Sequence, residues 1–122
     1  MNSFKIGNTE FSTGDIQFSI EKSLLSLEVN GNKDVFDKLT EDYDSEWSFA
    51  LYPPKFYLYD IPYEDKKIMI DEDFSYKYDV SLYMMEYNDF IGTLEITDKS
   101  INIQGQVDIM GDVLSLSIIL EK

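Results

Sequence analysis

The sequence of 122 residues contains no cysteine, no histidine and no arginine, since all ten of its basic residues are lysine. Without cysteine the chain can form neither a disulfide nor a thiolate zinc site. Without histidine it lacks the commonest general base and the commonest transition-metal ligand, and a Ser-His-Asp triad is excluded. Without arginine it cannot hold a phosphate or carboxylate in a bidentate fork. An enzyme built on this sequence would have to use Asp, Glu, Lys, Tyr, Ser or Thr alone.

Positive charge is scarce as well, because 24 acidic residues stand against 10 lysines and give a formal net charge of −14. A surface of this kind repels the phosphates of nucleic acids and the head groups of anionic membranes. A cationic protein would instead be attracted, and its encounter rate raised. We therefore expect a basic protein as partner, and neither nucleic acid nor a membrane. The alternative is that the acidity only keeps the chain soluble.

Long apolar runs are also missing, and the longest is far shorter than the roughly 20 residues that span a bilayer. The first residues, 1–5, are not followed by the apolar stretch of a signal peptide, so cytoplasmic residence is expected. With 43% hydrophobic residues the chain can still build a core. It has no internal repeat and no low-complexity linker, which predicts a single domain over residues 1–122.

What the sequence does have is alternation of apolar and polar residues with a period of two, which is typical of half-buried strands. Residues 16–20 and 25–29 follow this pattern in the first third of the chain. Residues 91–97, 100–109 and 113–120 follow it near the end, with turn residues between them, and predict an antiparallel meander. Within the middle strand of that meander, Gly105 indicates a bulge or a close approach of two backbones.

One short helix is predicted over residues 33–40, where Val35, Phe36 and Leu39 share a side and Asn32 or Asp34 can cap the start. The middle of the chain holds all nine tyrosines and the single tryptophan. The further strands expected there are residues 47–51, 56–61, 68–70 and 78–86. The fold class expected is therefore mainly β, either all-β or β-dominated α+β. Its architecture would be a curved antiparallel sheet or meander with one short helix.

The candidate binding residues lie in two acidic, tyrosine-containing segments in this middle region. Tyrosine offers a large, stiff contact area with a polar tip, while carboxylates steer and pair with lysine or arginine of a partner. The alternative is that the tyrosines pack half-buried on a sheet and the acids only solvate loops. The expected interface residues are Asp42, Tyr43, Asp44, Glu46, Tyr57, Tyr59, Asp60, Tyr63, Glu64, Asp65, Asp71, Glu72 and Asp73.

No catalytic, cofactor-binding or metal site is predicted. The run Asp71–Asp73 offers oxygen ligands, but it lacks the spacing of a calcium loop with its glycine and its twelfth-position glutamate. Carboxylate pairs suitable for glycoside hydrolysis could arise by chance among so many acids, yet no motif selects one pair. We therefore expect a non-enzymatic protein.

In size, acidity, β-rich character and lack of catalytic residues, the chain resembles the immunity proteins of bacterial polymorphic and contact-dependent toxin systems. Those proteins bind a cognate toxin domain, often a basic nuclease, and block it. The resemblance implies a toxin-neutralising inhibitor without a cofactor. Two alternatives stay open: an acidic phage-type inhibitor that mimics DNA, with carboxylates spaced regularly along one face, and a small-ligand β-barrel or sandwich with an aromatic-lined cavity.

Overall fold

The chain folds into two antiparallel sheets. The computed structural model describes residues 2–41, 52–63, 67–84, 87–109 and 111–121. The six-stranded sheet runs, in spatial order, through β2 (Thr9–Glu10), β1 (Ser3–Ile6), β11 (Asp112–Glu121), β10 (Ser100–Ile109), β9 (Phe90–Ile96) and β6 (Lys67–Ile70). The five-stranded sheet runs through β3 (Thr13–Glu21), β4 (Leu24–Gly31), β5 (Lys55–Pro62), β7 (Asp79–Tyr83) and β8 (Tyr87–Asn88). The mainly β fold class is therefore confirmed, with two sheets rather than one.

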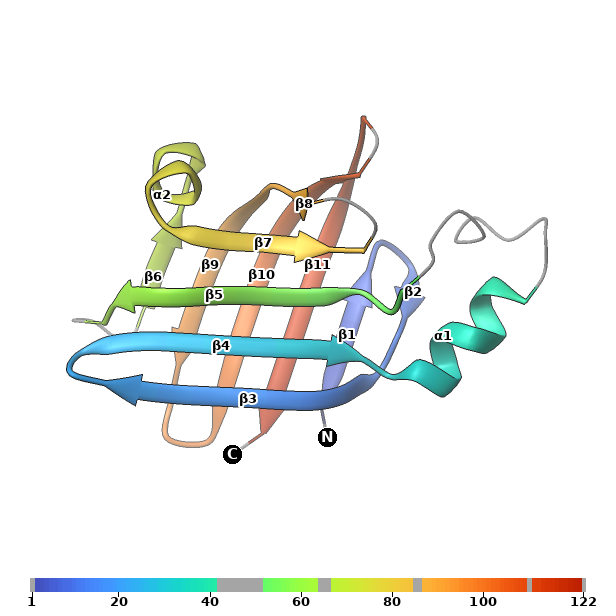
Figure 1. Cartoon of the computed structure of the whole chain (residues 1–122), viewed down its shortest axis with the longest axis horizontal. Helices are drawn as coiled ribbons and strands as arrows, with labels where there is room; N and C mark the ends of the chain where they lie inside the picture. Colours follow the sequence, from blue (N-terminus) through green and yellow to red (C-terminus); the bar gives the residue numbers. More distant parts are fainter. Residues whose placement is uncertain (1, 42–51, 64–66, 85–86, 110, 122) are drawn as a thin grey trace.

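The two sheets face each other, and Figure 1 shows that their strands cross at a large angle, as in orthogonally packed sandwiches. The hydrophobic core lies between them. Phe4 and Phe11 meet edge to face at 6.4 Å between ring centroids, and Phe56 of β5 meets Phe90 of β9 in the same way at 5.1 Å. Because each strand alternates inward and outward side chains, one face of each sheet is left for contacts with solvent or a partner.

The predicted C-terminal meander is confirmed, since β9, β10 and β11 pair in sequence and Ile103, Val107, Leu116 and Ile118 are buried. Gly105 marks a close approach and not a bulge, because the register of β10 with both neighbours is continuous. It lies directly opposite another glycine of β9, and this pair leaves room for the Phe90 ring.

Two helices are present where the sequence predicted one. The predicted helix α1 (Lys33–Thr40) is confirmed with its cap, since the Asn32 side chain accepts hydrogen bonds from the backbone N–H groups of Asp34 (3.0 Å) and Val35 (3.1 Å). The second helix, α2 (Glu72–Lys77), occupies part of the second acidic segment, where no helix was predicted. It forms because the Asp71 carboxylate caps its start and because acidic residues fill its first turn, where their negative charge interacts favourably with the helix dipole.

Of the other predicted strands, residues 56–61 and 68–70 are confirmed as parts of β5 and β6. Residues 78–86 are confirmed only over β7, and the predicted strand at residues 47–51 lies outside the described residues. Residues 16–20 form part of β3, but their apolar side chains are more exposed than the predicted half-buried strand would have them. Because β3 is the last strand of its sheet, Ile16, Phe18 and Ile20 keep 37%, 40% and 43% of their surface exposed.

Candidate functional site

Four tyrosines form a contiguous aromatic surface on the outer face of the five-stranded sheet, here called the tyrosine platform: Tyr57, Tyr59, Tyr83 and Tyr87. Strand β5 sends Phe56 and Leu58 into the core, so Tyr57 and Tyr59 point outward. The rings of Tyr57 and Tyr59 are stacked at 4.9 Å between centroids. Tyr87 joins them edge-on at 6.3 Å from Tyr57, and Tyr83 lies 5.0 Å from Tyr87.

Exposure to solvent differs across the tyrosine platform, from an enclosed ring at its centre to an exposed ring at its end. Tyr57 is only 6% exposed although it points away from the core, because neighbouring rings and the Lys55 side chain enclose it. Tyr87 is 71% exposed. A rigid aromatic surface that ends in one exposed ring can receive a partner at little cost in side-chain entropy, because the contacted rings are already ordered.

Charged side chains lie at the border of the tyrosine platform and affect the pKa values of the groups there. Glu28 of β4 forms a salt bridge of 3.0 Å with Lys55, whose ammonium lies 5.8 Å from the Tyr57 ring centroid. The hydrogen bond to Glu28 raises the pKa of Lys55, so this lysine stays protonated. Burial, and next the negative charge of Asp79, raise the pKa of Tyr57 to about 12. Its hydroxyl is therefore neutral at pH 7 and can donate a hydrogen bond.

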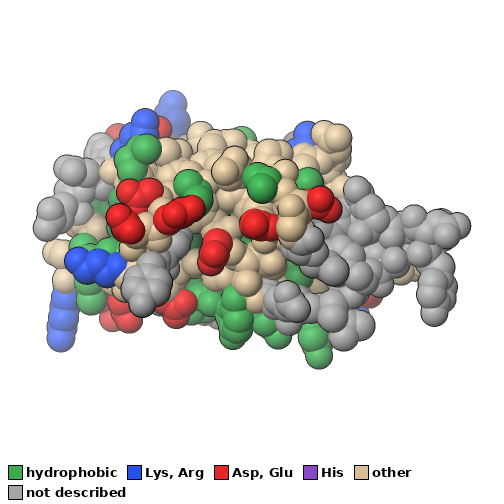
Figure 2. All heavy atoms as spheres, turned by 90° about the horizontal axis from the view of Figure 1, so that it is seen from above, with side chains coloured by type: hydrophobic (Ala, Val, Ile, Leu, Met, Phe, Trp, Pro, Cys, Tyr) green, Lys and Arg blue, Asp and Glu red, His purple; other side chains and the backbone are tan. Residues whose placement is uncertain are grey.

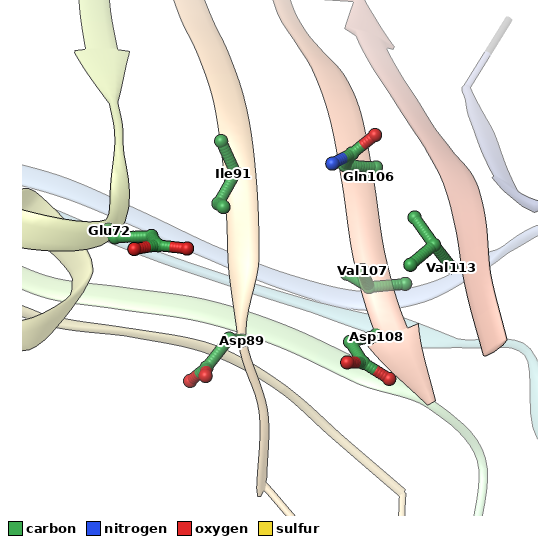
Figure 3. Close-up of a pocket in the computed structure, with 7 residues that line it drawn as sticks. All are labelled: Glu72, Asp89, Ile91, Gln106, Val107, Asp108 and Val113. Atoms are coloured by element: carbon green, nitrogen blue, oxygen red, sulfur yellow. The ribbon is translucent and has the colours of Figure 1, made fainter. Parts of the chain in front are cut away.

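A second surface feature is a depression of about 580 Å³ lined by Glu72, Asp89, Ile91, Gln106, Val107, Asp108 and Val113, here called the acidic hollow. Figure 3 shows its three carboxyl groups coming from three separate places in the fold: α2, the link between β8 and β9, and the end of β10. Figure 2 shows acidic side chains gathered on the face of the molecule that is seen from above. The hollow therefore combines negative charge with an apolar floor.

The hollow does not have the make-up of a metal centre. Within the described part of the chain, no group of three or more Asp, Glu, His or Cys side chains is arranged to hold a metal ion. Three carboxylates around an open depression instead suit several lysine or arginine side chains of a protein partner, each of which needs only one carboxylate nearby.

The tyrosine platform and the acidic hollow meet at β8. Tyr87 and Asp89 flank Asn88, which is 8% exposed and donates a hydrogen bond of 3.1 Å to the carbonyl of Leu82. The Ser81 hydroxyl donates a bond of 3.1 Å to the Asn88 carbonyl. Two Cα–Cα steps of about 3.8 Å separate Tyr87 from Asp89, so their Cα atoms lie within about 7.5 Å of each other. The last tyrosine of the platform and the first acidic residue of the hollow are therefore close along the chain.

Of the predicted interface residues, the structure brings Tyr57 and Tyr59 together in the platform and places Glu72 in the hollow. Asp71 accepts a hydrogen bond of 2.8 Å from the Phe74 backbone as the cap of α2, and Asp73 is exposed in the first turn of that helix. Asp60 is exposed at a φ of 54°, and its N–H donates to the Ser26 hydroxyl. Tyr63 is half-buried and packs against the core. The remaining predicted residues, Asp42, Tyr43, Asp44, Glu46, Glu64 and Asp65, lie outside the described residues.

Sequence reasoning missed Tyr83, Tyr87, Asp89 and Asp108. Both tyrosines belong to the tyrosine-rich middle region, and that clustering was the signal by which they could have been found. The two aspartates come together because the antiparallel pairing of β9 with β10 continues one residue beyond Phe90 and Val107, where the Asp108 N–H donates to the Asp89 carbonyl at 3.4 Å.

Comparison of the chain with protein-family models, with curated proteins and with solved structures finds no match. None of the helices in the described part of the chain is long and apolar enough to cross a membrane.

Proposed function

We propose that the chain is a non-enzymatic acidic binding protein that captures a basic protein, and that this partner is a toxin domain which it neutralises as an immunity protein. The observation that carries the proposal is the meeting of the tyrosine platform and the acidic hollow at β8. Aromatic anchors with carboxylates beside them are the two components that a protein interface needs for slow dissociation and fast association.

The acid–base properties of the platform support a binding role over catalysis. General acids and bases work best with pKa values near the pH of the reaction. The described groups whose pKa clearly departs from its usual value are Lys55, Tyr57 and Tyr59, and in each the pKa is raised further above neutrality. These shifts keep the three side chains in one protonation state at pH 7. They suit fixed hydrogen-bond donors and not proton-transfer groups.

The two alternatives, a small-ligand β-barrel or sandwich and an acidic DNA mimic, gain less support from the structure than the binding protein does. A ligand-binding barrel would hold its tyrosines around an interior cavity, whereas the platform tyrosines lie on the outer face of a sheet whose inner face packs into the core. A DNA mimic would space its carboxylates along an elongated face, whereas Glu72, Asp89 and Asp108 converge on one depression.

The proposal predicts a toxin domain encoded beside this gene, and its test is the binding kinetics of the purified chain with that domain. Because charge acts mainly on association, the triple variant Glu72→Gln, Asp89→Asn, Asp108→Asn should associate more slowly with little change in dissociation. Raising the salt from about 0.05 to 0.5 M should slow association of the unmodified chain in the same way, as the Debye length falls from roughly 14 to 4 Å. Tyr87→Ala should instead speed dissociation, by roughly 30-fold if the ring contributes about 2 kcal/mol.

Matched controls separate local contacts from general charge and surface effects. The variant Asp34→Asn, Asp37→Asn, Glu95→Gln removes the same number of charges from exposed positions elsewhere and should slow association much less. Met69→Ala removes a side chain that is 65% exposed on β6 and should leave dissociation unchanged. Absence of binding, or equal slowing by both triple variants, would contradict the proposal.

A further inference from the structure

Strand β3 is an open edge of unusual length for this molecule. The other strands at the ends of the two sheets are short: β2 and β8 have two residues each and β6 has four, whereas β3 has nine. Among the residues that the structure describes, no strand pairs with the outer side of β3. Alternate backbone N–H and C=O groups of an edge strand point away from its sheet and can pair with another chain.

The usual protections of an edge are missing from the middle of β3. Natural edge strands are kept from pairing by lysine, proline, bulges or a covering element. The stretch Ile16–Ile20 contains neither lysine nor proline, and the irregular register of β3 with β4 is confined to the segment between Thr13 and Ile16. From Ile16 to Glu21 the pairing with β4 is regular. This stretch is thus a regularly paired, exposed template for a further strand.

The two faces of β3 differ in chemistry. Ile16, Phe18 and Ile20 lie opposite buried residues of β4 and share their inward face, yet each keeps about two fifths of its surface exposed. The other face carries Gln17, Ser19 and Glu21, and the exposed Asp15 comes just before the regularly paired stretch. A strand that continues the sheet would therefore present apolar side chains inward, and it would gain from positive charge opposite Asp15 and Glu21.

The six-stranded sheet extends past the open edge of the five-stranded sheet. Figure 1 shows the loop between β9 and β10 lying beyond β3, the last strand of its own sheet. On its outer face, a shallow depression of about 210 Å³ runs from Gln17 and Ser19 of β3 to Glu28 and Tyr59. The open edge is therefore continuous with the tyrosine platform.

We infer that β3 receives an extended segment of the basic partner as a sixth strand of the five-stranded sheet. The segment has apolar side chains at alternate positions and lysine or arginine facing Asp15 and Glu21. This inference rests on the proposed function and adds the mode of docking. Main-chain hydrogen bonds supply the contact, and the alternating side chains supply the selectivity.

A second copy of the chain fits the edge less well than a basic segment. Antiparallel pairing of two β3 strands about Phe18 would place Ile16 against Ile20, but it would also place Asp15 of each copy against Glu21 of the other. A register shifted by two residues avoids that repulsion but leaves Ile20 opposite Gly14 in one direction and Ile16 opposite Lys22 in the other. Charge and side-chain matching therefore favour a single strand of opposite charge.

The test uses the synthetic peptide Lys-Val-Thr-Val-Thr-Val-Lys, which is symmetric and places its lysines opposite Asp15 and Glu21 in either direction. Titration followed by backbone amide NMR should shift the signals of residues 16–21 before those of any other segment. The peptide with glutamate at both ends should bind at least tenfold more weakly, and a peptide N-methylated at alternate residues along its pairing edge should not bind. Equal binding of the glutamate peptide, or shifts that begin outside β3, would overturn the inference.

Variants of the chain complete the experiment. Phe18→Lys should abolish peptide binding, because a lysine on the inward face of an edge strand blocks pairing. Ile119→Lys changes a side chain of similar exposure (38%) on β11 and should leave peptide binding intact.

If sedimentation shows a dimer that Phe18→Lys dissociates, the occupant is a second copy and the inference is wrong. If the toxin domain binds Phe18→Lys as well as the unmodified chain, the strand-docking inference fails while the proposed function stands. If the peptide binds β3 but the toxin domain does not bind the chain, the proposed function fails, and with it the basic partner that the inference requires.

Discussion

Replacing Gly105 with alanine should lower the free energy of unfolding by about 3 kcal/mol or more, at the upper end of the range for overpacking. A Cβ atom at this position would lie 2.2 Å from the carbonyl oxygen of Ile91, 2.7 Å from the Cα of Gly92 and 2.8 Å from the Phe90 ring. Two of these three neighbours are backbone atoms of a central strand, so they cannot move aside without breaking the pairing of β9 with β10.

The same clash extends into the core. Phe90 occupies the space that the glycine pair leaves, and it packs edge to face on Phe56 of the other sheet. Displacing the Phe90 ring would therefore disturb the contact that joins the two sheets. Urea unfolding followed by circular dichroism measures the effect, with Gln106→Ala as the control because that side chain is exposed on the adjacent position. A loss below about 1 kcal/mol for Gly105→Ala would show that the close approach is not a constraint on the fold.

Truncating Leu116 to alanine is the second large effect, with an expected loss of about 2–5 kcal/mol in the free energy of unfolding. Leu116 is 1% exposed on β11, where it lies between Ile6 of β1 and Gly105 of β10. Its glycine neighbour has no side chain that could fill the cavity, so relaxation around the missing atoms is limited.

The measurement is again urea unfolding, with Val113→Ala as the control on the same strand. The Val113 side chain is 59% exposed, and its truncation should cost less than about 0.5 kcal/mol. Equal losses for the two variants would mean that β11 does not bury the face that its pairing assigns to the core.

Local pattern predicted much of this fold because period-two alternation depends only on which face of a strand is buried. The meander of β9, β10 and β11 follows from it, whereas residues 56–61 of β5 are apolar or aromatic on both faces, so the pattern did not show which side Tyr57 and Tyr59 occupy. The cap of α1 was equally local, since Asn32 bonds to residues two and three positions away.

What sequence could not predict depends on how distant segments meet. The division into two sheets requires the chain to pass from one sheet to the other at several links, among them the one between β8 and β9, and no residue pattern marks those crossings. The acidic hollow also needs Glu72, which α2 brings to Asp89 and Asp108 at the end of the paired strands β9 and β10. The exposure of Phe18 likewise follows from the position of β3 at the end of its sheet, although its alternation matches that of a covered strand.

The most direct test of the proposed binding surface is amide hydrogen exchange of the chain, alone and in complex with the basic toxin domain that the proposed function requires. Complex formation should slow exchange at residues 87–91, 106–109 and 111–113, where the tyrosine platform meets the acidic hollow. Segments remote from this junction, such as α1, should exchange at unchanged rates. Protection confined to α1, with residues 87–91 unchanged, would contradict the account.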